Sequence, residues 1–174
     1  MPITEFSNFT DGLAAANRRR DQFITDTNLD DERLWIPYVP DVWFQACQFN
    51  VTTGGFTNIL KVNPGAKLPV HYHISPVWGY TIRGEWYYLE HDWVARPGTF
   101  IYEPAGEAHT LTVSASAKEP MITFFVLSGG LIYIDNISNG KVVAYDDGFT
   151  LLELARTHYK NVGLDLALLD AMIR

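Results

Sequence analysis

Residues 65–84 read GAKLPVHYHISPVWGYTIRG and contain a His-x-His pair, His71 and His73. The context is that of an extended chain, in which side chains two positions apart leave the same face. The two imidazoles can therefore converge on one point, while Tyr72 points the other way. The Ser75-Pro76 pair that follows predicts a turn, which places the histidines where strands begin and end.

A second stretch, residues 98–109, reads GTFIYEPAGEAH and ends on a third histidine, His109. Its Pro-x-Gly turn at residues 104–106 redirects the chain, because proline fixes φ and glycine accepts positive φ. His109 is therefore predicted to open the next strand.

The spacings Gly-x5-His-x-His and Gly-x5-Pro-x-Gly-x2-His, in this order, resemble the two signature motifs of the cupin superfamily. A lone His-x-His pair would often be two surface residues, but the paired motifs are specific. The resemblance implies an all-β fold, the cupin jelly-roll β-barrel, with the two motifs on neighbouring strands. It also implies that His71, His73 and His109 point inward and bind one divalent metal ion.

Most cupins add a glutamate ligand shortly after the His-x-His pair, and this position is Val77 here. Since Val77 cannot coordinate a metal, the resemblance implies three neutral imidazole ligands and several open positions. Such a site favours an anionic substrate that binds through two oxygens. We expect Fe(II) as the cofactor, although imidazole ligands would also accept zinc, nickel or copper.

Residues 34–145 consist of short runs rich in Val, Ile, Thr and aromatic residues, separated by proline and glycine. Such runs are typical of antiparallel sandwiches and barrels. We expect the cupin barrel to span these residues. The predicted strands are 43–51, 56–62, 77–83, 85–91, 99–103, 109–113, 121–127 and 131–134.

The two ends of the chain are predicted to be helical. Residues 1–33 are expected to form an N-terminal arm with a short helix capped by Asp11. In residues 146–174, apolar side chains recur at helical spacing, which predicts two amphipathic helices. These helices must bury their apolar faces on the barrel or on a second subunit. The arm, barrel and helices are expected to form one domain.

The 174 residues are 47% hydrophobic, which suits one compact domain with a sizeable core. The net charge of −7 argues against a nucleic-acid partner, because such proteins neutralise phosphates with clustered Lys and Arg. Cys47 is the single cysteine, so no intrachain disulfide can form. No run approaches the roughly 20 apolar residues that span a membrane. These features predict a cytoplasmic protein without a membrane partner.

Two carboxylates flank the Pro-x-Gly turn beside His109. Glu103, the candidate catalytic residue, and Glu107 could each orient a ligand histidine or handle a proton near the metal. Each is also explained as a carboxylate at the barrel rim. His91 is expected to bond a neighbouring carboxylate in a turn, and His158 to lie on a helix surface or at an interface.

Aromatic residues come from the predicted strands near both motifs. Trp78, Tyr80 and Tyr102 are the candidate substrate-binding residues, because a pocket for an aromatic substrate would use such side chains. Since side chains alternate along a strand, the aromatic residues of these strands cannot all face inward.

Three longer stretches resemble the 2,4'-dihydroxyacetophenone dioxygenase family of non-haem iron cupins. They are residues 34–44 (LWIPYVPDVWF), 88–111 (YLEHDWVARPGTFIYEPAGEAHTL) and 141–163 (KVVAYDDGFTLLELARTHYKNVG). The resemblance implies catabolism of an aromatic α-hydroxyketone, whose carbon-carbon bond is cleaved with O2 to give an aromatic carboxylic acid and formate. Trp78 stands where some relatives carry histidine, and its bulky indole could reshape the pocket.

Two other functions are compatible with the motifs. A dioxygenase that cleaves β-diketones would also bind its substrate by chelation, and the sequence does not separate it from the first function. A regulatory cupin, like the sensory half of an anti-sigma factor, would hold zinc without turnover. Such a module normally follows a helical zinc-binding domain rich in His and Cys, and residues 1–33 contain neither. A homo-oligomer is expected, because cupin barrels expose sheet edges that pairing can cover.

Overall fold

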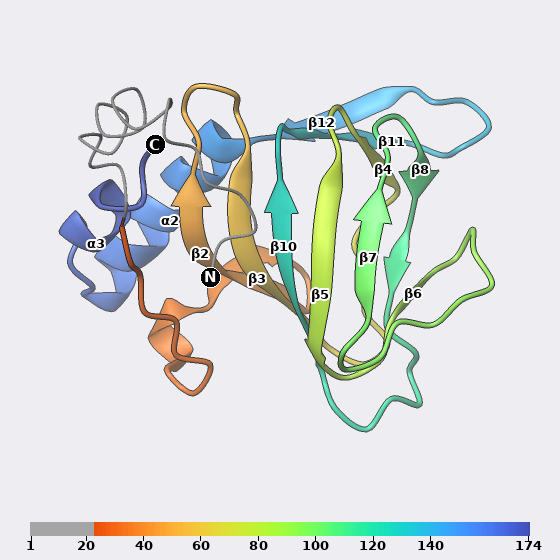
Figure 1. Cartoon of the computed structure of the whole chain (residues 1–174), viewed down its shortest axis with the longest axis horizontal. Coiled ribbons are helices and arrows are strands. Elements are labelled where there is room, and N and C mark those ends of the chain that lie inside the picture. Colours follow the sequence, from red (N-terminus) through yellow and green to blue (C-terminus); the bar gives the residue numbers. More distant parts are fainter. Residues whose placement is uncertain (1–22) are drawn as a thin grey trace, which may run out of the picture.

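The computed structural model describes residues 23–174, which form antiparallel β-sheets with helices at one end (Figure 1). The helix expected near Asp11 lies outside these residues. The strands are β1 (Ile36–Val39), β2 (Val42–Phe49), β3 (Phe56–Val62), β4 (His71–His73), β5 (Val77–Arg83), β6 (Tyr87–Tyr88), β7 (Phe100–Glu103), β8 (Ala108–His109), β9 (Leu111–Thr112), β10 (Met121–Leu127), β11 (Leu131–Ile134) and β12 (Val142–Asp146). The helices are η1 (Glu32–Leu34), a 3-10 turn, α2 (Gly148–Val162) and α3 (Ala167–Asp170).

The larger sheet has the strand order β1-β2-β3-β10-β5-β7, and the smaller has β12-β11-β4-β8. A third sheet consists of the two short strands β6 and β9. Neighbours in each sheet run antiparallel, and strands distant in sequence pair, such as β3 with β10. This arrangement confirms the predicted all-β cupin jelly roll.

Strand β5 alternates strictly between the core and the outer face. Val77 and Thr81 are 1% exposed, whereas Trp78 and Tyr80 are exposed. The inward position between them is Gly79, where an added Cβ would lie 2.7 Å from both the Phe125 ring and the Ile101 side chain. The absent side chain therefore lets two apolar residues of the neighbouring strands pack over β5.

Helix α2 packs against β1 and β2 and covers the end of the sheet that lies on the left in Figure 1. Its first turn is held by a capping box between Asp147 and Thr150, and Gly163 ends it in the left-handed conformation with φ 73°. The buried side chains of α2 share one face: Leu151, Leu152, Ala155 and Tyr159. This confirms the expected amphipathic helix on the barrel.

The second predicted helix is reduced to α3, a single turn of 4 residues. The chain beyond it runs alongside the larger sheet, where Ile173 forms a parallel bridge with Phe49. The amide of Phe49 donates to Met172 O, and the amide of Arg174 donates to Phe49 O. Backbone pairing with β2 thus replaces further helical turns.

Other differences from the predicted strands are local. β1, β4 and β12 are not among the predicted strands, although an extended chain was expected at His71 and His73. Only Tyr87–Tyr88 of the expected strand at residues 85–91 is extended in a sheet. The bounds of β3, β5, β10 and β11 agree with the prediction. Within residues 23–174, no helix is long and apolar enough to cross a membrane.

Candidate metal centre

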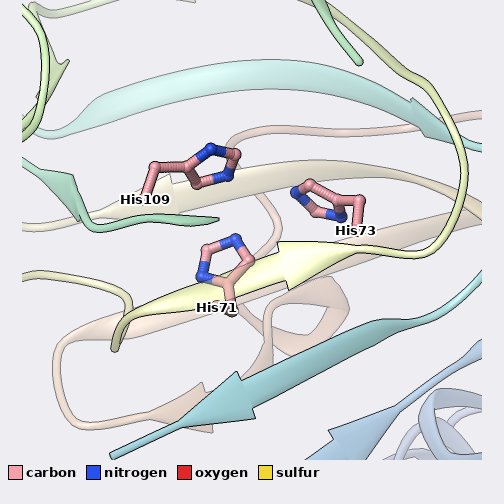
Figure 2. A group of neighbouring side chains, drawn as sticks. All are labelled: His71, His73 and His109. Atoms are coloured by element: carbon pink, nitrogen blue, oxygen red, sulfur yellow. The ribbon is translucent and has the colours of Figure 1, made fainter. Parts of the chain in front are cut away.

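Three histidines converge inside the barrel (Figure 2). His71 and His73 lie on β4, and His109 lies directly opposite His71 on the paired strand β8. Their ring centroids are 4.8 to 5.3 Å apart, and one nitrogen from each ring lies within 4.8 Å of the others. All three side chains are buried. The predicted ligand set is therefore assembled by one antiparallel strand pair.

The hydrogen bonds of the rings leave nitrogens free toward the centre of the group. His71 Nδ1 lies 2.7 Å from the carbonyl oxygen of Pro69, so Nδ1 carries the proton and Nε2 keeps its lone pair. His73 Nδ1 and His109 Nε2 are buried without any hydrogen-bond partner among the described residues. Buried nitrogens without partners are costly unless another group satisfies them, and a metal ion would do so.

Burial favours the neutral form of two of these imidazoles, His71 and His109. It lowers the pKa of His71 well below the ordinary value, and the neighbouring His73 and His109 lower that pKa further. Burial also lowers the pKa of His109 to about 4. Neutral imidazole is the form that binds metals. Three imidazole nitrogen donors suit Fe(II), zinc, nickel or copper, and the residues present therefore fit a divalent transition metal.

Glu103 adds a carboxylate to the histidine group. The residue is 3% exposed, and its Oε2 lies 3.2 Å from His73 Nε2 and 3.5 Å from His109 Nε2. Burial acts to raise the pKa of Glu103, but His73, His109 and the hydroxyl of Tyr88 outweigh burial and lower the pKa. Glu103 is therefore a carboxylate at neutral pH, beside two of the three candidate ligands.

Tyr88 supports both Glu103 and His109. Its hydroxyl donates to Glu103 Oε1 at 2.5 Å, whereas Oε2 accepts no hydrogen bond from the described residues. The Tyr88 ring also stacks on the His109 ring, with centroids 3.9 Å apart and planes 7° from parallel. Glu90 holds Thr110, the residue that follows His109, because the Glu90 carboxylate accepts hydrogen bonds from the amide and the hydroxyl of Thr110. No motif in the sequence indicates these roles of Tyr88 and Glu90.

A cavity adjoins the histidines and is mostly apolar. Its volume is about 40 Å³. The apolar lining comes from both sheets and from α2, with Phe56, Leu60, Leu68, Val77, Leu111, Phe125, Leu127, Leu131 and Leu151. The polar lining consists of Tyr38, Asn58, His71, His73, Tyr88 and Glu103. An apolar body with a polar, chelating end would suit these walls.

The three aromatic residues expected to bind substrate do not line this cavity. Trp78, Tyr80 and Tyr102 lie on the outer face of the larger sheet, where they are 38%, 49% and 54% exposed. Trp78 and Tyr102 are cross-strand partners on β5 and β7. The strict alternation of β5 turns its aromatic side chains outward when Val77 faces the histidines. The aromatic residues of the cavity are instead Tyr38, Phe56, Tyr88 and Phe125.

Glu107 is not in the histidine group either. Its Oε1 lies 3.0 Å from His91 Nε2 in a partly exposed pair. His91 therefore has the expected carboxylate partner. His158 lies on the exposed side of α2, and its Nε2 is 2.9 Å from the carbonyl oxygen of Arg33.

The fold and the buried histidine group define a cupin whose site could hold a metal ion. Residues 24–132 match the family model of the ChrR cupin-like domain, and the chain belongs to this family. None of the curated proteins searched matches the chain.

Solved structures with the same fold cover most of the chain. An RmlC-like cupin protein from Ralstonia eutropha JMP134 is 30% identical, with a TM-score of 0.71, covering 82% of this chain and 92% of its own. A cupin-fold protein of unknown function from the same organism is 19% identical, with a TM-score of 0.70, and the match covers 79% of this chain and 91% of that protein. An acetylacetone dioxygenase from Acinetobacter johnsonii is 15% identical, with a TM-score of 0.66, and the match covers 80% of this chain and 97% of that protein.

Proposed function

We propose that this protein is a non-haem iron dioxygenase that cleaves the carbon-carbon bond of an aromatic α-hydroxyketone. The reaction consumes one ArC(O)CH2OH and one O2 and yields one ArCOOH and one HCOOH, so all atoms balance. His71, His73 and His109 would hold the iron. The aromatic acid and formate would be the products of an aromatic degradation step.

The observation that carries this proposal is the neutral ligand set beside an apolar cavity. Val77, at the position where most cupins place a carboxylate ligand, is an apolar wall residue. Bound Fe(II) would supply Lewis acidity and one-electron chemistry toward O2. Because imidazole binds a metal as a neutral ligand and three histidines leave positions open, the site favours a substrate that brings its own negative charge and two oxygens.

Glu103 is the proposed catalytic residue. Its Oε2 is a buried acceptor without a hydrogen-bond partner, next to His73 and His109. A substrate held at the histidine group would present its α-hydroxyl to this oxygen, which can take the hydroxyl proton. Tyr88 keeps the other oxygen, Oε1, engaged and so fixes the direction in which Oε2 points. The deprotonated ketone then has two adjacent oxygens for chelation.

The β-diketone alternative rests on a different observation. An acetylacetone dioxygenase has the same fold, so the fold is compatible with a diketone substrate. A diketone would also chelate through two oxygens. The apolar cavity wall, with Phe56 and Phe125, is our reason to favour an aryl substrate. A regulatory cupin would bind metal without turnover, and only an activity measurement separates it.

A homo-oligomer is also proposed, as expected from the sequence. Strand β7 is the edge of the larger sheet, and its exposed residues continue the aromatic outer face of β5. Four large residues contribute to this outer aromatic face: Trp78, Tyr80, Phe100 and Tyr102. A second copy of the chain that covers this face would bury both the aromatic side chains and the sheet edge.

Oxygen uptake tests the proposed reaction. The protein is loaded with Fe(II) without air and then given O2 with either 2-hydroxyacetophenone or a 1,3-diketone. We expect uptake with the hydroxyketone, with benzoate and formate formed in equal amounts. Uptake with the diketone alone would favour the alternative dioxygenase. Full iron occupancy without uptake on either compound would favour the regulatory cupin.

A further inference from the structure

Asn58 is a buried amide in the apolar wall of the cavity. It lies on β3 between Ala46 of β2 and Phe125 of β10, and it is 6% exposed. Its Oδ1 has no hydrogen-bond partner among the described residues. An amide oxygen buried without a partner destabilises a folded protein. Such a cost at a cavity wall points to a ligand that satisfies the amide when it binds.

The other polar groups of the cavity away from the metal already have partners. The Tyr38 hydroxyl donates to Asp146 Oδ2 at 2.7 Å and also bonds the Tyr133 hydroxyl. The Tyr88 hydroxyl donates to Glu103. Outside the histidines and Glu103, Asn58 is therefore the cavity residue whose buried polar atom has no partner.

We propose that Asn58 determines substrate specificity by hydrogen bonding a neutral hydroxyl on the part of the ligand that does not chelate the metal. This inference rests on the proposed function for the chelating end of the ligand. A hydroxyl suits an amide in either orientation, because it can donate to Oδ1 and accept from Nδ2. An acidic group does not suit it, since no Lys or Arg of residues 23–174 lines the cavity to balance a second negative charge.

The ligand class follows from the walls around Asn58. Phe56, Leu60 and Phe125 surround the amide with apolar surface, so the body of the ligand between its two polar ends is apolar. A hydroxylated aryl ketone has this pattern. A site built to bond a hydroxyl rejects the analogue without it, because the analogue leaves the buried amide unpaired.

Binding to the zinc-loaded protein tests the inference without turnover, because zinc has no redox chemistry. The two probes are 2,4'-dihydroxyacetophenone and 2-hydroxyacetophenone, which differ only in the ring hydroxyl. We expect the wild type to bind the ring-hydroxylated ketone about tenfold more tightly, and Asn58→Leu to remove this preference. Steric effects of leucine act on both ketones, so the ratio of the two dissociation constants isolates the hydrogen bond.

Gln45→Met is the matched control. Gln45 is a second buried amide with an unpartnered oxygen, but it does not line the cavity. This variant is expected to keep the wild-type ratio. A loss of preference in Gln45→Met equal to that in Asn58→Leu would overturn the assignment, as would an unchanged ratio in Asn58→Leu.

If Asn58→Leu does not fold, the wild type still decides the question. In zinc-loaded, ¹⁵N-labelled protein, the side-chain amide resonances of Asn58 should move with the ring-hydroxylated ketone and much less with the other. Equal movement with both ketones, or none with either, would overturn the inference. A preserved hydroxyl preference without oxygen uptake by the iron-loaded protein would instead count against the proposed reaction alone.

Discussion

Val77 and Glu103 face each other as cross-strand partners on β5 and β7, and both are buried against the histidine group. The position that supplies a glutamate ligand in most cupins is apolar here, and a carboxylate stands one strand away. That carboxylate approaches His73 and His109 to within 3.5 Å. The chain thus keeps a negative charge near the proposed metal but on a different strand.

Moving the carboxylate back to β5 should separate metal binding from turnover. We expect Val77→Glu to bind metal at least as tightly as the wild type and to lose most oxygen uptake, because the new anion would occupy a position that the chelating substrate needs. Since a carboxylate directly opposite Glu103 is destabilising, the double variant with Glu103→Gln should fold better than Val77→Glu alone.

Metal content, thermal midpoint and oxygen uptake are measured in the same preparations. Val77→Gln is the control for size without charge, and it should affect metal affinity little. Full activity of Val77→Glu with metal bound would refute a role for the neutral ligand set. A parallel loss of folding, metal and activity in both the glutamate and glutamine variants would mean that Val77 only fills space.

Removal of any one histidine should abolish tight metal binding. We expect about one metal ion per chain in the wild type and strongly reduced occupancy in His71→Ala, His73→Ala and His109→Ala. Elemental analysis after dialysis measures the occupancy. His91→Ala is the control, because His91 pairs with Glu107 outside the group. A variant that keeps full occupancy would remove its histidine from the ligand set.

Tyr88→Phe should impair turnover without loss of metal. The change deletes the hydrogen bond to Glu103 Oε1 but keeps a ring that can stack on His109. The Glu103 carboxylate would then no longer be held in one orientation toward the substrate. We therefore expect kcat to fall about tenfold or more. Steady-state oxygen uptake and metal content are measured together. Unchanged kcat at full occupancy would show that the hydroxyl does not position Glu103.

The sequence predicted the histidine group because motif spacing encodes it directly. His71 and His73 share a strand face by alternation, and the Pro-x-Gly turn brings His109 onto the paired strand. The bounds of four strands, β3, β5, β10 and β11, were also predictable, since each is a continuous run of β-forming residues between turn residues. Strand β1 was missed because Pro37 lies within it, and β12 was missed because it is mostly exposed. Strand β4, of 3 residues, was expected only as an extended stretch around the histidines.

The aromatic residues were assigned to the wrong face for a reason that the sequence contains. The ligand position at Val77 must point inward, so Trp78 and Tyr80 must point outward. Asn58 carries a similar signal. It alternates with the apolar residues Phe56 and Leu60, which makes it a polar residue on a buried face. The absence of a partner for its oxygen, however, depends on the packed neighbours and needs the structure.

Cys47 is expected to be unreactive in the native protein. Burial raises the pKa of its thiol to about 11. At pH 8 the native thiolate fraction is then about one in a thousand, and alkylation by iodoacetamide should be roughly 100-fold slower than in denaturant. The unfolded chain ionises first as pH rises, so stability should fall between about pH 9 and 11. A native rate close to the denatured rate would contradict burial, and Cys47→Ala should remove this contribution to the pH slope.

The outer aromatic face should mediate self-association. Trp78 and Tyr102 are neighbours across β5 and β7, with ring centroids 5.9 Å apart, and both are exposed. We expect an oligomeric mass by light scattering at micromolar concentration, and a lower mass for the double variant Trp78→Ser and Tyr102→Ser. Ile137→Ser is the control, because Ile137 is 51% exposed on the connection between β11 and β12 of the other sheet. Its mass should equal that of the wild type. A wild type that is monomeric would contradict the proposed self-association. An oligomer whose mass is unchanged in the double variant would mean that the interface lies elsewhere on the surface. The double variant should keep its metal occupancy, since neither residue lines the cavity beside the histidines.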